Sequence, residues 1–167
     1  MYVGNEQPPY LVFNKTALSI TDNHAHLGVT FSQTCKWHTH INNIVLSASK
    51  LIEVMWKLKF TVRRKTLNQI YVSFLPPTLE NAVVVCDNCT QQDKDRLEKI
   101  QIEAARLVTG TTIYITLQKI YREIGWLTPE NRRTYQKIIL AFKIKNTIVP
   151  EYFSSLFSRT TNESKNY

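Results

Sequence analysis

Most of the chain shows the three- and four-residue spacing of apolar side chains that is typical of amphipathic helices. The longest such stretch begins at Trp37, continues for about six turns and predicts one long helix. Its apolar positions are Ile41, Ile44, Val45, Ala48, Leu51, Ile52, Met55 and Leu58. Further helices are predicted over residues 62–75, 78–85, 91–109, 117–124 and 129–145, and a last amphipathic turn over 150–157.

Capping residues indicate where these helices begin and end. The predicted caps are Thr61, Thr90 and Thr128 at N-termini and Gly110 and Gly125 at C-termini. Pro76 and Pro77 are expected to end the helix over 62–75, because proline lacks the backbone N–H that the next turn requires. In the helix over 129–145, the side chains expected to face the core are Tyr135, Ile138, Ile139 and Phe142.

The segment before Trp37 follows a two-residue period instead, which predicts short strands. Their expected ranges are 11–13, 18–20 and 26–31, with a turn over 21–24. In the last of them, Leu27, Val29 and Phe31 alternate with smaller residues, as in a half-buried strand. Gly28 allows another segment to approach the backbone closely.

The predicted fold class is therefore mainly α, with a small N-terminal β-hairpin, a helical bundle and a helical C-terminal extension. The 167 residues are enough for one domain, or one and a half. The longest apolar runs are five residues, over 82–86 and 138–142, against about 18 for a membrane span. Without a secretory signal in the first residues, and with three cysteines, we expect free thiols and an intracellular protein, in the nucleus or cytoplasm, that is not secreted and does not enter a membrane.

Charge indicates the class of partner. The formal net charge is +8, which favours a polyanion. Residues 36–65 contain seven Lys or Arg and one acid, Glu53. Cations at a helix C-terminus are explained by the helix dipole, but Arg63, Arg64 and Lys65 fall at a predicted N-terminus, where the dipole disfavours them. Contact with nucleic-acid phosphates would explain them, and a solvated surface is the alternative.

Motifs for catalysis are absent from the sequence. The four glycines do not form a phosphate-binding loop, and no pair of acidic residues has the spacing of a two-metal site. Cys86 and Cys89 form a C-x-x-C pair, and Cys35, His38 and His40 could complete a zinc site. No second C-x-x-C pair follows, so buried or capping cysteines are preferred and no metal or other cofactor is predicted for this chain.

Several stretches together resemble a known family. They are HLGVTF, KWHTHINNI, IYVSFLPPTLENA, LEKIQIEAARLVTG and YREIGWLTPENRRTYQKI. In this order and spacing, over about residues 10–157, they resemble the C-terminal part of reverse transcriptases of jockey-like non-LTR retrotransposons. The resemblance implies the end of a polymerase palm, a thumb and the helical region that follows it.

The resemblance also implies an organisation. Residues 1–33 would be a hairpin remnant of the palm, 34–89 a thumb-like helical bundle, 90–157 a C-terminal helical region and 158–167 a frayed tail. Leu27, Gly28 and Val29 would be a primer grip. The thumb surface would carry the nucleic-acid-binding cations, chosen by charge within that region: Lys50, Lys57, Lys59, Arg63, Arg64 and Lys65.

The family's catalytic aspartates, which hold Mg in the full-length enzyme, have no counterpart in this sequence. We therefore expect no catalytic residue and no polymerisation by this chain alone. The expected function is that of a fragment that binds RNA or DNA duplexes by their backbone, with the missing palm and fingers as its other partners. Two alternatives stay open: a protein-interaction or homo-oligomerisation module that uses exposed Trp37, Trp56 and Tyr71, and a non-functional remnant of a decayed mobile element.

Overall fold

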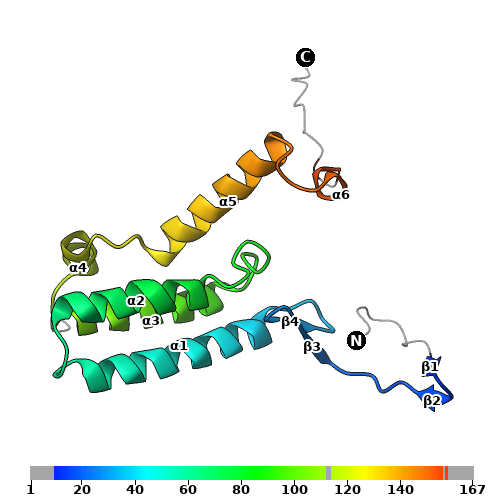
Figure 1. Cartoon of the computed structure of the whole chain (residues 1–167), viewed down its shortest axis with the longest axis horizontal. Helices are drawn as coiled ribbons and strands as arrows, with labels where there is room; N and C mark the ends of the chain where they lie inside the picture. Colours follow the sequence, from blue (N-terminus) through cyan, green and yellow to red (C-terminus); the bar gives the residue numbers. More distant parts are fainter. Residues whose placement is uncertain (1–9, 112–113, 156, 158–167) are drawn as a thin grey trace.

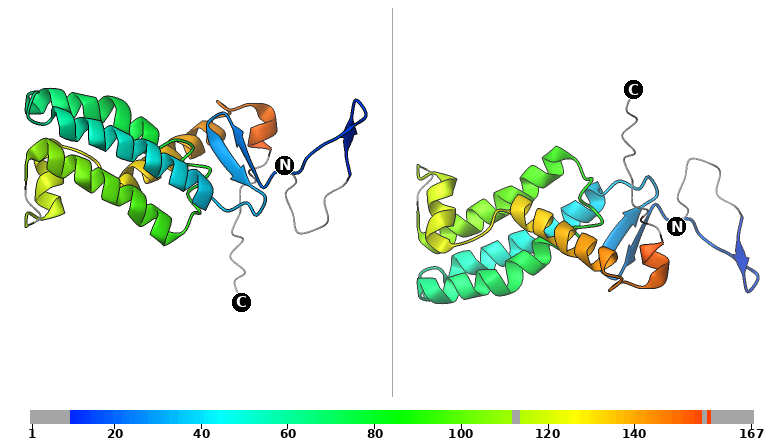
Figure 2. Two further views of the ribbon diagram at one scale, coloured as in Figure 1. Left: turned by 90° about the horizontal axis from the view of Figure 1, so that it is seen from below. Right: turned by 90° about the horizontal axis from the view of Figure 1, so that it is seen from above.

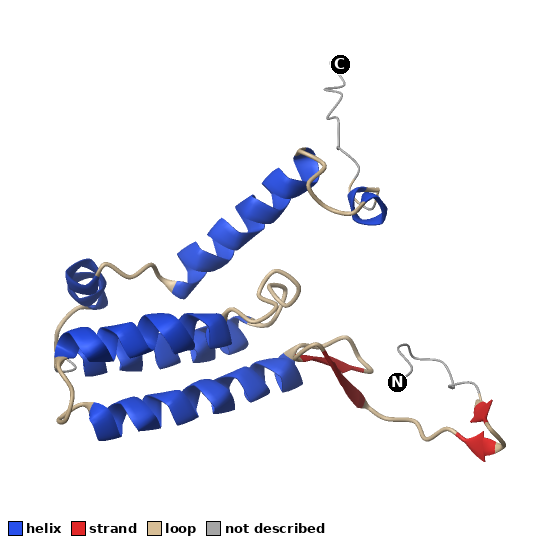
Figure 3. Ribbon diagram, in the orientation of Figure 1, coloured by secondary structure: helices blue, strands red, loops and turns tan. Residues whose placement is uncertain are grey.

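The computed structural model describes residues 10–111, 114–155 and 157 (Figure 1). In these ranges, four short strands precede six helices. The strands are β1 (Val12–Phe13), β2 (Thr16–Ala17), β3 (Asn23–His26) and β4 (Val29–Ser32). The helices are α1 (His38–Leu58), α2 (Arg64–Leu79), α3 (Gln91–Thr109), α4 (Leu117–Ile124), α5 (Pro129–Lys145) and α6 (Glu151–Ser154). The prediction of a mainly helical chain with a small N-terminal β structure is confirmed, as the colours of Figure 3 show.

Helices α1, α2 and α3 lie side by side and enclose the hydrophobic core (Figures 1 and 2). His38 contacts Asp93 at the starts of α1 and α3, and Trp56 contacts Glu103 farther along both helices, so these two helices run parallel. Helix α2 runs in the opposite direction and packs against both of them. From the predicted stripe of α1, five residues are fully buried: Ile41, Ile44, Ala48, Ile52 and Met55.

Helix α3 is capped as predicted. The Thr90 hydroxyl accepts a hydrogen bond from the Asp93 backbone N–H at 3.2 Å, and Gly110 ends the helix in the left-handed conformation with φ +69°. Helix α5 begins in the same way, with the Thr128 hydroxyl accepting from the Asn131 N–H and with Pro129 in the first turn. These caps satisfy backbone groups that the helices themselves leave unpaired.

Helix α2 differs from its prediction at both ends. Its N-cap is Arg63, without a side-chain hydrogen bond, rather than Thr61. Its C-terminal end lies beyond Pro76 and Pro77, both inside the helix, because the buried Leu75 and Leu79 keep that turn packed against the core. The separate helix predicted over 78–85 is therefore wrong: its first residues belong to α2 and the others form turns.

The N-terminal region contains two antiparallel hairpins rather than three predicted strands. The segment 21–24, expected to be a turn, leads into β3, and β3 pairs with β4 from Asn23 opposite Ser32 to His26 opposite Val29. Leu27 and Gly28 form the turn, with φ of +48° and +80°. Leu27 is 88 % exposed and does not lie on a buried strand face. The β1–β2 hairpin contacts no other described helix or strand.

Helix α5 has the predicted bounds, but its predicted orientation is wrong. Tyr135, Ile138 and Phe142, expected in the core, are each at least 60 % exposed. The side toward the bundle carries Arg132 and Arg133, which pair with Glu80 and Asp87. Lys137, in the middle of the helix, also pairs with Asp87. Ion pairs thus attach the first half of α5, and its second half rises away from the bundle (Figure 1). No helix in the described ranges is both long and apolar enough to cross a membrane.

Candidate nucleic-acid interface

Five of the predicted cations gather where α1 turns into α2, which we call the basic corner: Lys57, Lys59, Arg63, Arg64 and Lys65. Helix α1 ends at Leu58, whose carbonyl accepts hydrogen bonds from the backbone N–H groups of Thr61 and Val62. Val62 packs against the core and anchors the connection. The backbone of Arg63 is then extended, with ψ 151°, and starts α2. A partly buried anchor therefore places the cations on the outside of a tight corner.

Three of the six predicted cations have partners within the chain. Lys57 pairs with Glu53 at 3.0 Å, and both side chains are largely exposed. Arg64 Nη2 lies 2.6 Å from Glu123 Oε1 on α4, with both side chains about half exposed. Lys59 Nζ lies 4.7 Å from the centroid of the Trp56 ring, a cation–π contact. Exposed pairs of this kind contribute at most about 1 kcal/mol, so the cations stay available to a stronger anion.

The other three, Lys50, Arg63 and Lys65, are exposed and form no ion pair with a described residue. The first turn of α2 contains no acidic residue, although the helix dipole favours a negative charge there. Arg63 and Lys65 thus add positive charge to an N-terminus that is already positive. An external anion would relieve this repulsion.

The residues predicted as a primer grip lie at the tip of the β3–β4 hairpin. Leu27 and Gly28 form a tight turn, and Val29 begins β4. Glycine suits this position for two reasons: its φ of +80° is strained for other residues, and a Cβ there would crowd Asn81 Nδ2 at 3.3 Å. Asn81 Nδ2 donates to the Gly28 carbonyl at 3.3 Å and fixes the hairpin to the end of α2.

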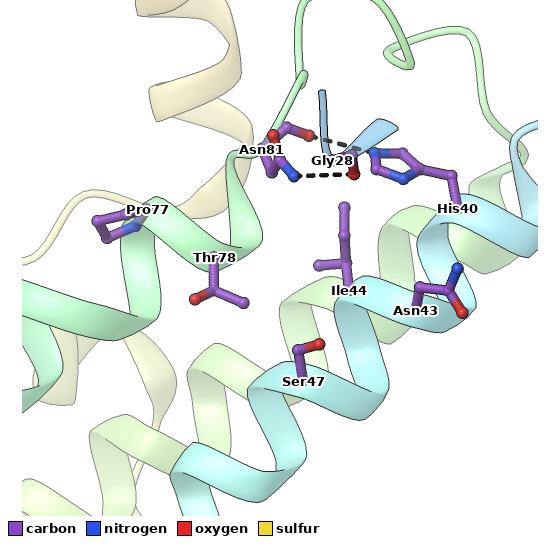
Figure 4. Close-up of a pocket in the computed structure, with 8 residues that line it drawn as sticks. All are labelled: Gly28, His40, Asn43, Ile44, Ser47, Pro77, Thr78 and Asn81. Carbon is purple, nitrogen blue, oxygen red and sulfur yellow. Dashed lines mark hydrogen bonds between the residues drawn. The ribbon is translucent and has the colours of Figure 1, made fainter. Parts of the chain in front are cut away.

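A hollow of about 430 Å³ opens beside this hairpin tip (Figure 4). Gly28, Asn81 and the buried imidazole of His40 meet at one end, while Ser47 and Thr78 line the other. His40 Nδ1 accepts from the Thr30 backbone N–H at 3.3 Å, which leaves Nε2 as the donor to the Asn81 carbonyl at 3.5 Å. Burial lowers the pKa of His40, so the imidazole is neutral in this arrangement.

The structure does not bring the two predicted groups together. The hairpin tip lies beside the first turns of α1 and the basic corner beyond its last turn, a separation of about 30 Å for a helix of this length. Lys50 lies between them along α1. A ligand that contacts both groups would have to be elongated.

Of the residues considered for zinc, His38 and His40 form other contacts within the fold. His38 Nδ1 lies 2.9 Å from Asp93 Oδ1, Cys35 is exposed, and burial raises the pKa of the Cys86 thiol to about 11. Burial also raises the pKa of Cys89. In the part of the chain that the structure describes, no three His, Cys, Asp or Glu side chains are grouped to hold a metal ion.

The aromatic stripe considered for protein contacts is only partly exposed. Trp56 is 45 % exposed, but Trp37 donates its indole N–H to Asn88 Oδ1 at 2.7 Å. Tyr71 is 1 % exposed and stacks on Trp126 with an angle of 8° between the rings. The expected exposure of Tyr71 is therefore wrong.

A second hollow, of about 450 Å³, lies between α1 and α3 next to the basic corner. Its lining includes Trp56, Lys59, Lys99, Glu103 and Arg106. The sequence analysis did not select the last three as site residues, because α3 lies outside the basic stretch of the sequence. Their spacing of four and three residues places them on one helix face, but the sequence does not show which helix that face meets.

Comparison with known protein families, with curated proteins and with solved structures finds no match for this chain.

Proposed function

We propose that this chain binds RNA or DNA duplexes through their phosphate backbone, independently of base sequence. The observation that carries the proposal is the set of exposed cations Lys50, Arg63 and Lys65, which have no acidic partner among the described residues. Lysine and arginine contacts to phosphate supply affinity and position a duplex, but they do not read its bases.

The remaining cations of the basic corner extend this surface. Lys57, Lys59 and Arg64 belong to the same corner as Arg63 and Lys65 and are held only by contacts at the surface. Exchanging one exposed carboxylate for a phosphate costs little, because such pairs are weak in water. Binding at the corner therefore requires no refolding of α1 or α2.

The resemblance to reverse transcriptases supports a thumb-like role for the same surface. In that role, α1–α3 would hold the duplex, and Leu27, Gly28 and Val29 would approach the primer strand. The catalytic aspartates and the Mg ions of such a polymerase would belong to a palm outside this chain. The proposal for the chain itself is therefore binding without catalysis.

Salt dependence of duplex binding tests the proposal. Each neutralised phosphate contributes about −0.9 to the slope of log K against log salt on B-form DNA. We expect a slope of about −3 if the three unpaired cations act alone, and of about −5 if all six take part. Binding that does not weaken with salt, or no binding at low salt, would contradict the proposal.

A matched pair of triple variants separates the surface from net charge. Replacing Lys50, Arg63 and Lys65 by Ala should reduce the magnitude of the slope by about 3 and weaken all sequences alike. The control, K119A/K143A/K145A, removes the same charge from exposed positions on α4 and α5. Equal losses in both variants would indicate attraction by net charge alone.

The exposed side of α5 favours a second candidate, a protein-interaction module. Tyr135, Ile138 and Phe142 follow one another at three and four residues, on one face, and no described element covers them. Exposed apolar patches of this kind are typical of interaction sites. Self-association is the property that distinguishes this candidate from nucleic-acid binding.

A further inference from the structure

The hollow between α1 and α3 combines an aromatic platform with positive charge. Trp56 is 45 % exposed at its wall, and three cations line it: Lys59, Lys99 and Arg106. Among the described residues that line it, the one carboxylate is that of Glu103. Its volume of about 450 Å³ falls in the range of small-molecule sites, about 300–1,000 Å³.

The indole of Trp56 is held in place from its edge. Its Nε1 donates to Glu103 Oε1 at 3.3 Å, a contact that links α1 to α3 and fixes the plane of the ring. The ring face is occupied by the ammonium group of Lys59, at 4.7 Å from the centroid. A lysine side chain is flexible, so this cation can leave the ring face and remain at the rim of the hollow.

Arg106 is the observation that points to an anion. Its Nε is buried and has no hydrogen-bond partner within the described ranges. A buried guanidinium N–H without a partner is destabilising, and an acceptor that reaches it would remove that cost. Lys99, two turns earlier on the same face of α3, adds an exposed positive charge to the same hollow. Phosphate oxygens satisfy both groups.

We propose that this hollow binds an unpaired nucleotide of a nucleic-acid strand, with the base stacked on the Trp56 indole. The phosphate lies among Lys59, Lys99 and Arg106. A planar base matches the ring and a phosphate matches the cations around it, which is the combination that single-stranded nucleic-acid sites use. The inference rests on the proposed function and extends it from duplex backbone to a single-stranded end beside the basic corner.

Tryptophan fluorescence reports on the stacking directly. The chain has three tryptophans, and the other two are engaged inside the fold: Trp37 donates to Asn88, and Trp126 stacks on Tyr71. We expect a short oligothymidylate or oligouridylate to quench the fluorescence of the wild type, and the quench to disappear in W56F. Thymidine monophosphate and inorganic phosphate, tested in parallel, distinguish a strand from a free nucleotide or a bare anion. A quench that persists in W56F would overturn the inference, as would equal binding of inorganic phosphate.

Affinity provides the second measurement. Replacing Trp56 by Ala should weaken single-strand binding by about 5- to 100-fold, the range expected for stacking of one base, and should affect a blunt duplex less. The control is Y135A, which removes an exposed aromatic from α5.

The charges are tested in the same way. The variant K99A/R106Q should weaken binding of the single strand more than the control K119A/K143A does. Equal losses of single-strand affinity in a variant and its control would contradict the proposed nucleotide site.

Two outcomes separate this inference from the proposed function. In the first outcome, the duplex binds with the expected salt slope, but W56A and W56F bind the single strand as the wild type does. The proposal of a stacking site is then wrong, and the proposal of backbone binding is kept. If the single strand binds and depends on Trp56 while the duplex does not bind, the stacking site stands alone. Thermal unfolding of W56A shows whether it folds; where it does not, the fluorescence of W56F decides.

Discussion

His40 joins three parts of the molecule through one neutral ring. Its Nδ1 accepts from β4 at Thr30, its Nε2 faces the Asn81 carbonyl after α2, and the ring is 1 % exposed on α1. Protonation of Nδ1 would remove the acceptor for the Thr30 N–H and place a charge in a buried site. The hairpin therefore depends on an uncharged histidine.

Stability should fall in mildly acidic solution for this reason. Burial lowers the pKa of His40 in the folded state, so below the ordinary value of 6.5 the unfolded chain binds a proton that the folded chain does not. We expect the free energy of unfolding, from urea titrations, to decrease as the pH falls from 7.5 through 6.5 toward the folded pKa. H40N, whose side-chain oxygen can still accept from Thr30, should lose this part of the dependence. An unchanged pH profile in H40N would show that His40 is not its source.

His40 also illustrates what the sequence leaves open for a single residue. The apolar period predicts Ile41 and Ile44 in the core, and both are buried. Histidine carries no such signal, because its burial requires partners such as Thr30 and Asn81, which lie ten and 41 positions away in the sequence. Only the fold shows that these partners are present.

At the level of elements, the caps of α3 and α4 differ in a way that can be measured. Both helices begin after a threonine, Thr90 and Thr116, but only the Thr90 side chain forms a cap hydrogen bond. Thr90 Oγ1 also donates to Asp93 Oδ2 at 2.8 Å, and Asp93 is 1 % exposed. The hydroxyl of Thr90 thus satisfies one helix N–H and one buried carboxylate oxygen.

Replacing Thr90 by Ala should lower the free energy of unfolding by about 1–2 kcal/mol, because both contacts are lost. The matched control, T116A, should change it by less than about 0.5 kcal/mol. Chemical denaturation of the two variants measures the difference. A T90A protein as stable as T116A would mean that the cap of α3 is not what holds Asp93 in place.

The predictions for α2 and α5 are wrong for different physical reasons. Helix α2 continues through Pro76 and Pro77 because tertiary packing of Leu75 and Leu79 outweighs the lost backbone hydrogen bonds. Helix α5 has a clear apolar side, but ion pairs of Arg132 and Arg133 turn its charged side toward the bundle. Periodicity identifies a helix and its apolar side, but it does not show what that side meets.

At the scale of the whole molecule, the exposed apolar side of α5 is the feature that could cause self-association in solution. If Tyr135, Ile138 and Phe142 associate with a second copy, the sedimentation coefficient should rise with protein concentration. I138E/F142E should then remain monomeric, because a charge in an apolar interface is costly. The control V72E/F74E changes two exposed apolar residues of α2. A monomer at every concentration would argue against dimerisation through α5.

The proposed binding surfaces lie at the two ends of the bundle. The basic corner and the hollow of Trp56 adjoin at one end of the bundle, while the hairpin tip lies at the other, about 30 Å away. A duplex along α1 could reach both ends, and its unpaired end could enter the hollow. Salt dependence and Trp56 fluorescence report on the two contacts independently.

The amino-acid sequence by itself determined the helices, because apolar period and capping residues act locally: α3, α4 and α5 have the predicted bounds. It also determined the excess of positive charge in residues 36–65. Only the tertiary structure decided which cations lack acidic partners and which side of α5 is exposed. It also decided that Arg106 of α3 lies in the same hollow as Trp56 of α1. These properties depend on contacts between residues that are distant in the sequence. Neither the spacing of apolar residues nor the composition reveals such contacts.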